Sequence, residues 1–456
     1  AYNTAVGYHA GANISTGTSN TLIGGLAGDA LTTGVRNTAV GYNALSSETG
    51  AGQLTAIGQD ALKTYNKGSG DGNNVAVGYH SAQLMSTGTN SVIIGALAGN
   101  ALTTGSSNVV LGYNALGNED TGSRNIAIGS SALENLNNDA DSYNIAIGHN
   151  AGRQVTTGIE NIIIGGTAGD ALTTGGRNVV IGTYALSNED EHGNNVAIGW
   201  KALQDQDAGA DAYNVAIGYE AGKEITTGAN NTLIGYAGRA LTSGGRNIAI
   251  GHLALNQEDA HGKNVAIGFY ALQSQNAGAD AYNVAIGYDA GKSVTTGQQN
   301  ILIGGSAGDA LTTGTGNVAI GMEALSTEDA LGHTVAIGYQ ALKFQNSPSN
   351  SYNVAVGSQA GKSVTSGIQN TIIGGFSGDA LTTGDLNVSL GYQSLTTEDT
   401  GSRNVAVGSY ALQLLNYDGI GYNTGVGYGA GQSISTGTSN TLIGGVSGDA
   451  LTTGNN

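Results

Sequence analysis

The 456-residue chain contains no cysteine, only one proline and only 11% charged residues. The absence of cysteine excludes disulfides and thiolate metal sites. No apolar run is long enough to span a bilayer, so we expect no membrane insertion by this segment. Lysine and arginine total 15 against 33 acidic residues, which gives a formal charge of −18. This balance excludes a nucleic-acid partner, because phosphate neutralisation needs a basic surface.

What the chain does contain is 78 glycines and a short motif that recurs along its whole length. In forms such as NTAVG, NTLIG and NVAIG, the motif occurs 26 times, mostly 17 residues apart. Every fourth unit is stretched to 19 or 20 residues, and the unit from Asn231 has 16. Four units make a super-repeat of about 70 residues, which predicts one continuous repeat domain over residues 1–456. The expected super-repeats are 3–73, 74–143, 144–213, 214–282, 283–352, 353–422 and the partial 423–456.

Each unit predicts one coil of a parallel β-solenoid. β-Branched residues two apart, such as Val196 and Ile198, share one face of an extended strand. We expect these two to point into the coil. The glycine that follows indicates a corner, and a second short strand and a glycine-bearing turn then close the coil. A coil of 17 residues cannot bury its own core, but stacked coils can. The fold class is therefore all-β, a parallel β-solenoid (β-roll) of 26 coils, since a helix would pay about 1 kcal/mol for each interior glycine.

The opening asparagine and the corner glycine are the most regular positions of the unit. Asparagine opens 23 of the 26 units, and the glycine is invariant. Stacking would align both into columns, with the asparagines forming a side-chain ladder. Representative members of this structural ladder are Asn3, Gly7, Asn144, Gly148, Asn214, Gly218, Asn283 and Gly287.

The strands are apolar on both faces. The residue between the two β-branched positions is alanine in most units and leucine or isoleucine in the second unit of each super-repeat. A strand that is apolar on both faces is buried on both faces, and a single solenoid has one interior. We therefore expect a homo-oligomer, most of all a trimer, although another domain or a lateral coil could also cover the face. The residues assigned to the oligomer face are Leu22, Ile93, Ile163, Leu233, Leu302, Ile372 and Leu442.

The motifs NVAIG, NIAIG and NTAVG resemble the NSVAIG repeat of trimeric autotransporter adhesin heads. The resemblance implies a left-handed parallel β-roll that trimerises through the strand carrying the motif. Repeats of the form NTAIGYNAL also resemble those of phage tail-fibre shafts. An extracellular location, on a virion tail fibre or a bacterial surface, follows as an expectation. Ala1 and Tyr2 match the end of a fourth unit, so we expect this chain to be part of a longer one.

No break in the repeat suggests a catalytic centre, so we expect no enzyme and no cofactor. Acidic residues recur, as Asp170 does in the second units and the pair Glu189 and Asp190 in the third units. We interpret them as a solvated acidic edge. A calcium site at Asp170, Glu189 and Asp190 is the alternative, because calcium prefers carboxylate oxygens on flexible turns. Histidines such as His192 and His261 are expected at exposed positions.

Tyrosine is frequent, with 21 residues, and could either pack over the long fourth-unit loops or bind partners. The function that the sequence favours is a structural or adhesive fibre, a shaft or head that forms a rigid homotrimeric rod for surface display or host attachment. Its partners would be copies of itself and a host-surface glycan or protein receptor. The alternative is a secreted or cell-surface filament of solenoids stacked end to end. A mass measurement in solution separates the two.

Overall fold

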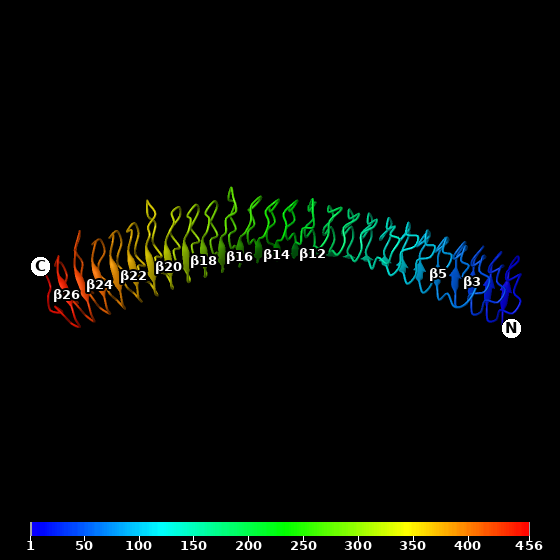
Figure 1. The fold of residues 1–456 in the computed structure, drawn as a ribbon, viewed down its shortest axis with the longest axis horizontal. Helices are drawn as coiled ribbons and strands as arrows, with labels where there is room; N and C mark the ends of the chain where they lie inside the picture. Colours follow the sequence, from blue (N-terminus) through cyan, green and yellow to red (C-terminus); the bar gives the residue numbers. More distant parts are fainter. Residues whose placement is uncertain (1, 456) are drawn as a thin grey trace. The chain divides into compact units, whose positions relative to one another are not determined.

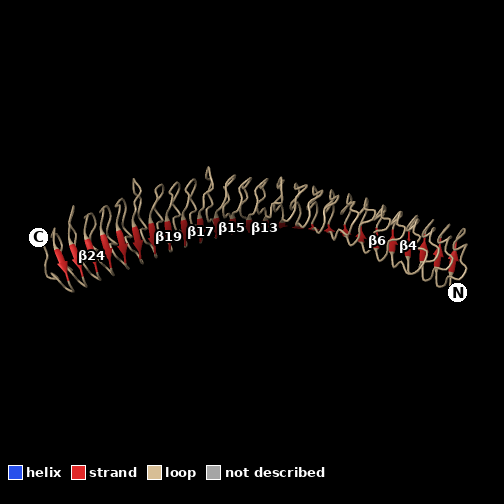
Figure 2. Cartoon of the chain, viewed as in Figure 1, coloured by secondary structure: helices blue, strands red, loops and turns tan. Residues whose placement is uncertain are grey.

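The computed structural model describes residues 2–455 and forms two compact units, divided between Asn230 and Asn231. Residues 1 and 456, which the sequence analysis included in the repeat domain, lie outside the described part. In both units successive coils stack with their three-residue strands along one side (Figure 1). All other described residues lie in turns and loops (Figure 2), and no helix that could cross a membrane is found among them. The expected all-β parallel solenoid is thereby confirmed.

The first unit contains thirteen strands. They are β1 (Thr4–Val6), β2 (Thr21–Ile23), β3 (Thr38–Val40), β4 (Thr55–Ile57), β5 (Val75–Val77), β6 (Val92–Ile94), β7 (Val109–Leu111), β8 (Ile126–Ile128), β9 (Ile145–Ile147), β10 (Ile162–Ile164), β11 (Val179–Ile181), β12 (Val196–Ile198) and β13 (Val215–Ile217).

The second unit also contains thirteen strands. They are β14 (Thr232–Ile234), β15 (Ile248–Ile250), β16 (Val265–Ile267), β17 (Val284–Ile286), β18 (Ile301–Ile303), β19 (Val318–Ile320), β20 (Val335–Ile337), β21 (Val354–Val356), β22 (Thr371–Ile373), β23 (Val388–Leu390), β24 (Val405–Val407), β25 (Thr424–Val426) and β26 (Thr441–Ile443).

Within each unit every strand pairs in parallel with the next strand of the chain. The register joins equivalent coil positions, as for Val92 with Val109 in β6 and β7. A longer coil does not change this register, because Thr55 pairs with Val75 across the 20-residue fourth coil. The extra residues of fourth coils are therefore accommodated as loops on the side away from the strands.

The corner glycine follows each strand and is required for two reasons. Gly148 has a φ of +141°, which L side chains rarely adopt. A Cβ atom built on Gly148 would also lie 2.4 Å from the carbonyl oxygen of Gly165, the corner glycine of the next coil. Stacking in register thus demands glycine at this column, since each corner backbone lies directly against the next.

The segment after the corner differs from the expected second strand. In the coil that begins at Asn37, both Asn43 and Leu45 have positive φ angles, of 55° and 53°. Left-handed residues interrupt an extended chain and turn it. The segment is therefore a run of turns, and neighbouring side chains such as Ala44 and Leu45 can both be buried, which a regular strand would prevent.

The asparagine column is a hydrogen-bonded ladder that links side chains to the backbone. Asn144 accepts the backbone N–H of Asn161 at Oδ1, at 3.0 Å, and donates from Nδ2 to the carbonyl of Gly158, at 2.8 Å. Asn161 continues the pattern with Asn178 and Gly175. Asn144 and Asn161 thus each join their own closing turn to the next coil, whereas Asn125 and Asn195, which open fourth coils, donate to the preceding coil at Ser123 and Gly193. Asn214 and Asn283 make the same Nδ2 contact with Gly228 and Gly297.

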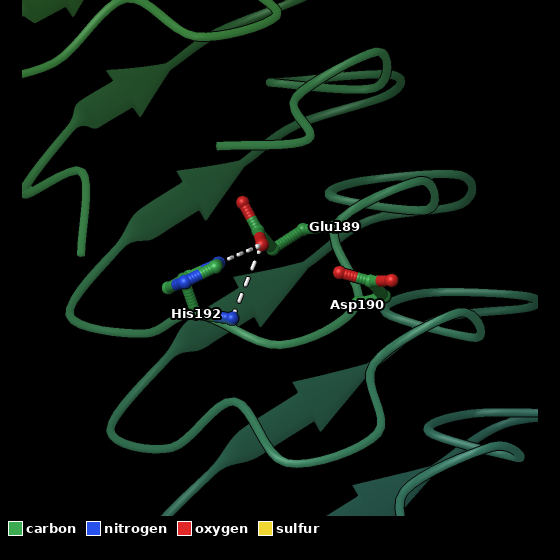
Figure 3. Close-up of side chains that lie close together, drawn as sticks. All are labelled: Glu189, Asp190 and His192. Atoms are coloured by element: carbon green, nitrogen blue, oxygen red, sulfur yellow. Dashed lines mark hydrogen bonds and ion pairs between the residues drawn. The ribbon is translucent and has the colours of Figure 1, made fainter. Parts of the chain in front are cut away.

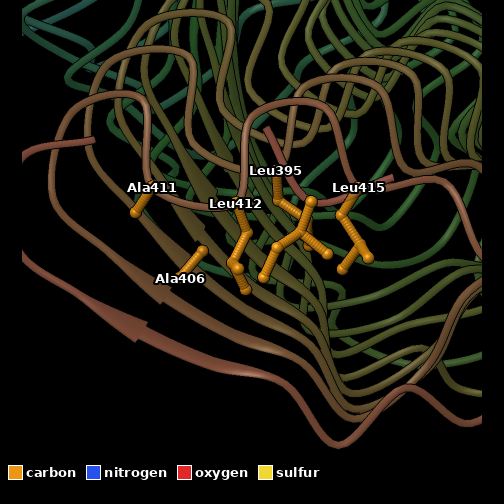
Figure 4. Packing of buried hydrophobic residues seen from close by; sticks show 6 residues of the cluster. Leu395, Ala406, Ala411, Leu412 and Leu415 are labelled. Atoms are coloured by element: carbon orange, nitrogen blue, oxygen red, sulfur yellow. The ribbon is translucent and has the colours of Figure 1, made fainter. Parts of the chain in front are cut away.

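The core lies between the strand side and the turn side of each coil. In the second unit Leu395, Leu412 and Leu415 come from the turn side and pack with Ala406 from β24 (Figure 4). All four side chains are fully buried. Burial of a leucine contributes about 1.5–3 kcal/mol, and most coils bury a leucine or another large aliphatic side chain in this way.

Candidate functional site

The middle residue of each strand points into the coil, which reverses the orientation expected from the sequence. Val196 and Ile198 of β12 are partly exposed, whereas Ala197 between them is fully buried. The residues assigned to the oligomer face are therefore core residues of their own chain, and that assignment is wrong. Leu22, Ile93, Ile163, Leu233, Leu302 and Ile372 are all 0% exposed, and Leu442 is partly buried.

The outward surface of the strands, the outer strand face, consists of the first and third strand residues. The first is valine, isoleucine or threonine and the third is valine, isoleucine or leucine in every strand, so the face carries no charge. Ile94 in the first unit and Ile301 in the second are 39% and 40% exposed. Each unit thus has an uncharged apolar face, and nothing among residues 2–455 of the single chain covers it.

Aromatic side chains follow the corner glycine and form short columns beside this face. In the second unit Tyr236, His252, Phe269 and Tyr288 come from four successive coils, with ring centroids 5.6, 5.0 and 5.7 Å apart. The last two contacts are nearly parallel stacks. The rings partly cover one another, although Tyr288 at the end of the column remains 59% exposed.

The tyrosines that end the fourth coils contact the preceding coil. The hydroxyl of Tyr143 accepts a hydrogen bond from Arg124 at 2.8 Å, and that of Tyr282 accepts one from Lys263 at 2.8 Å. The cations also lie over the rings, 5.4 Å and 4.9 Å from the centroids. Packing beside the fourth-coil loop is therefore what the structure shows for these tyrosines, although about half of each side chain remains exposed.

The glutamate of each third-coil acidic pair is buried, which corrects the expectation of a solvated acidic edge. Glu119, Glu189 and Glu398 are all 0% exposed. Oε1 of Glu119 accepts the N–H of Gly122, at 2.7 Å, and Oε2 accepts that of Asn138 in the fourth-coil loop, at 3.1 Å. The carboxylate thus holds its own turn and the base of the next loop. Hydrogen bonds from backbone N–H groups make its burial tolerable.

Burial without a neighbouring cation disfavours the charged form of these carboxyls. Desolvation raises the pKa of Glu119, Glu328 and Glu398 above its usual value, against the opposing effect of their hydrogen bonds. The same cause raises the pKa of Glu258 to about 7. Asp170 in the second coil also has a raised pKa, because it is desolvated, although Arg153 partly offsets this.

Of the residues considered for calcium, Glu189 and Asp190 lie together and Asp170 does not join them. Their third neighbour is His192, and one donor atom of each residue lies within 4.8 Å of the others (Figure 3). Sequence reasoning treated the histidines as separate surface residues. It missed this group, although the spacing of Glu, Asp and His within four residues was a visible signal.

Comparisons of the chain with protein-family models, with curated proteins and with solved structures found no match.

Proposed function

We propose that this chain is a structural or adhesive fibre segment, a shaft or head, in which three copies associate through their outer strand faces. The observation that carries the proposal is the uncharged apolar face on thirteen successive strands of each unit. Strands three residues wide, stacked about 4.8 Å apart, present about 600 Å² per unit. Exposed apolar patches of this size mark interfaces, and the face of each unit approaches the area of about 800 Å² that one partner contributes to a stable complex.

Three copies around a common axis would bury this face completely and leave the charged residues and the fourth-coil loops outside. The loops, such as residues 136–143, recur once per super-repeat and differ in sequence, so they would display variable surface to a glycan or protein receptor. The proposed extracellular location, on a phage tail or bacterial surface, is supported by the resemblance of the NVAIG repeats. The proposed role is mechanical and involves no catalysis.

The test combines mass with site-specific cross-linking. Light scattering of the purified chain is expected to give three times the chain mass of 45.3 kDa at all concentrations. Because the chain has no cysteine, single cysteines report proximity cleanly. Ile94→Cys on the outer strand face should give covalent dimers with a short thiol-specific cross-linker. Thr104→Cys, on an exposed turn of the same coil, is the matched control and should stay monomeric on a denaturing gel.

A single-chain mass at all concentrations would overturn the proposal. Equal cross-linking of both cysteine variants would overturn the assigned face. A mass that grows with concentration would instead support end-to-end stacking of solenoids, the alternative filament.

A further inference from the structure

Two third coils bring a glutamate, an aspartate and a histidine together in one turn. They are Glu189, Asp190 and His192 in the first unit, and Glu258, Asp259 and His261 in the second. In each group the donor atoms lie within 4.8 Å of one another, and residues 2–455 contain no other group of this kind. The other third coils have alanine, glycine or leucine at the histidine position.

The fold of the turn determines this arrangement. Oε1 of Glu189 accepts the backbone N–H of His192 at 3.1 Å, so the chain returns toward the carboxylate (Figure 3). The imidazole Nδ1 of His192 then lies 3.5 Å from the same oxygen. Glu258 and His261 repeat both contacts, at 3.2 Å and 3.9 Å. The buried base of the fourth-coil loop holds the glutamate side chain in place, so its carboxylate is a fixed metal ligand.

Buried polar atoms in these groups have no hydrogen-bond partner. Nδ1 of His192 and Nδ1 of His261 are both inaccessible and unpaired. The Glu258 side chain, whose Oε1 faces His261, is 0% exposed. Buried polar atoms without a partner are costly, and one cation placed between the carboxylate oxygen and the imidazole nitrogen would satisfy both.

We propose that each group binds one divalent transition-metal ion of the zinc class, through the histidine Nδ1 and the two carboxylates, with water completing the shell. Zinc takes nitrogen and oxygen donors at about 2.1 Å in tetrahedral geometry, which separates the donors by about 3.4 Å. The 3.5 Å between Nδ1 of His192 and Oε1 of Glu189 matches this separation. Asp190 is exposed, and one of its carboxylate oxygens lies within 4.8 Å of the other two donor atoms.

The donor set selects against calcium, which prefers six to eight oxygen ligands and no imidazole. A bound cation would also offset the cost of burying Glu258, which has no cation among its hydrogen-bond partners. The two sites would fasten the third-coil turns of their own units. This inference is independent of the proposed fibre function, because neither group includes a residue of the outer strand face.

The experiment is isothermal titration calorimetry, in which zinc chloride is added to the metal-stripped 456-residue chain. Two saturable sites per chain are expected. His192→Ala and His261→Ala should each remove one site, and the double variant should remove both. His149→Ala, which alters an exposed histidine in neither group, should keep two.

Cobalt(II) provides a second measurement that does not depend on heat. The visible absorption of four-coordinate cobalt should reach its maximum at two ions per chain and should disappear in the double histidine variant. Circular dichroism of each variant establishes that the solenoid is intact. The proposal is overturned if zinc does not saturate at two per chain, or if binding is unchanged in the double variant, which would show adventitious sites elsewhere.

Discussion

Replacement of one ladder asparagine tests how much of the stack depends on side-chain to backbone hydrogen bonds. Asn161 is fully buried in the first unit. Its Oδ1 accepts the N–H of Asn178 at 3.0 Å, and its Nδ2 donates to the carbonyl of Gly175 at 2.9 Å. Asn161→Leu keeps the branching at Cγ but deprives both backbone groups of this partner. At about 1–3 kcal/mol for each unsatisfied group, we expect a loss of about 2–6 kcal/mol.

The chain itself supplies the matched control. Ser91 occupies the same position in another coil, and its Oγ accepts the N–H of Asn108 at 3.2 Å. Asn161→Ser should therefore keep one of the two contacts and lose about 1–3 kcal/mol. Leu54, at the same position in a fourth coil, indicates that a leucine there still permits folding.

The assay is urea unfolding followed by far-ultraviolet circular dichroism, with the free energy of unfolding compared among the wild type and both variants. The slope against urea should be unchanged, which shows that the same surface unfolds. If Asn161→Leu lies within about 0.5 kcal/mol of the wild type, the ladder does not stabilise the stack. Equal losses of stability in Asn161→Leu and Asn161→Ser would show that the hydrogen bond accepted by Oδ1 contributes nothing to the free energy of unfolding.

Two further predictions concern the corner and the buried carboxyls. Gly148→Ala should cost at least about 1–3 kcal/mol in the same assay, because of its φ of +141° and the close carbonyl of Gly165. Gly209→Ala is the control, since nothing lies within 4 Å of its added Cβ, and equal losses would refute the reasoning. For Glu398, burial raises the pKa above the ordinary 4.5, so the folded chain binds the proton more tightly than the unfolded chain. The contribution of Glu398 to stability should therefore be greatest below 4.5 and be lost as the pH rises through its raised pKa. Glu398→Gln should remove this contribution in thermal melts across pH, and an unchanged dependence on pH would contradict the assignment.

The repeat, the strand positions, the corner glycine and the asparagine column could be predicted because each is a local regularity. The period of two between Val196 and Ile198 indicates a strand wherever it occurs. The prediction of a second strand was wrong because a left-handed backbone at residues such as Leu45 cannot be recognised from the pattern of apolar residues. The group of Glu189, Asp190 and His192 was missed because a charged side chain looks solvated until its backbone donors are known.

The sequence by itself determined that this chain stacks coils in register, since 26 glycine-terminated strands leave no other way to pair their backbones. Only the tertiary structure decided which face of each strand lies inside. The alternation of side chains along a strand defines two faces but does not say which one points into the coil, and here both faces are apolar. The coil closes over the middle residue, Ala197 in β12, and leaves Val196 and Ile198 outside. The choice follows from the direction in which the corner turns, which is a property of the folded backbone and not of hydrophobicity.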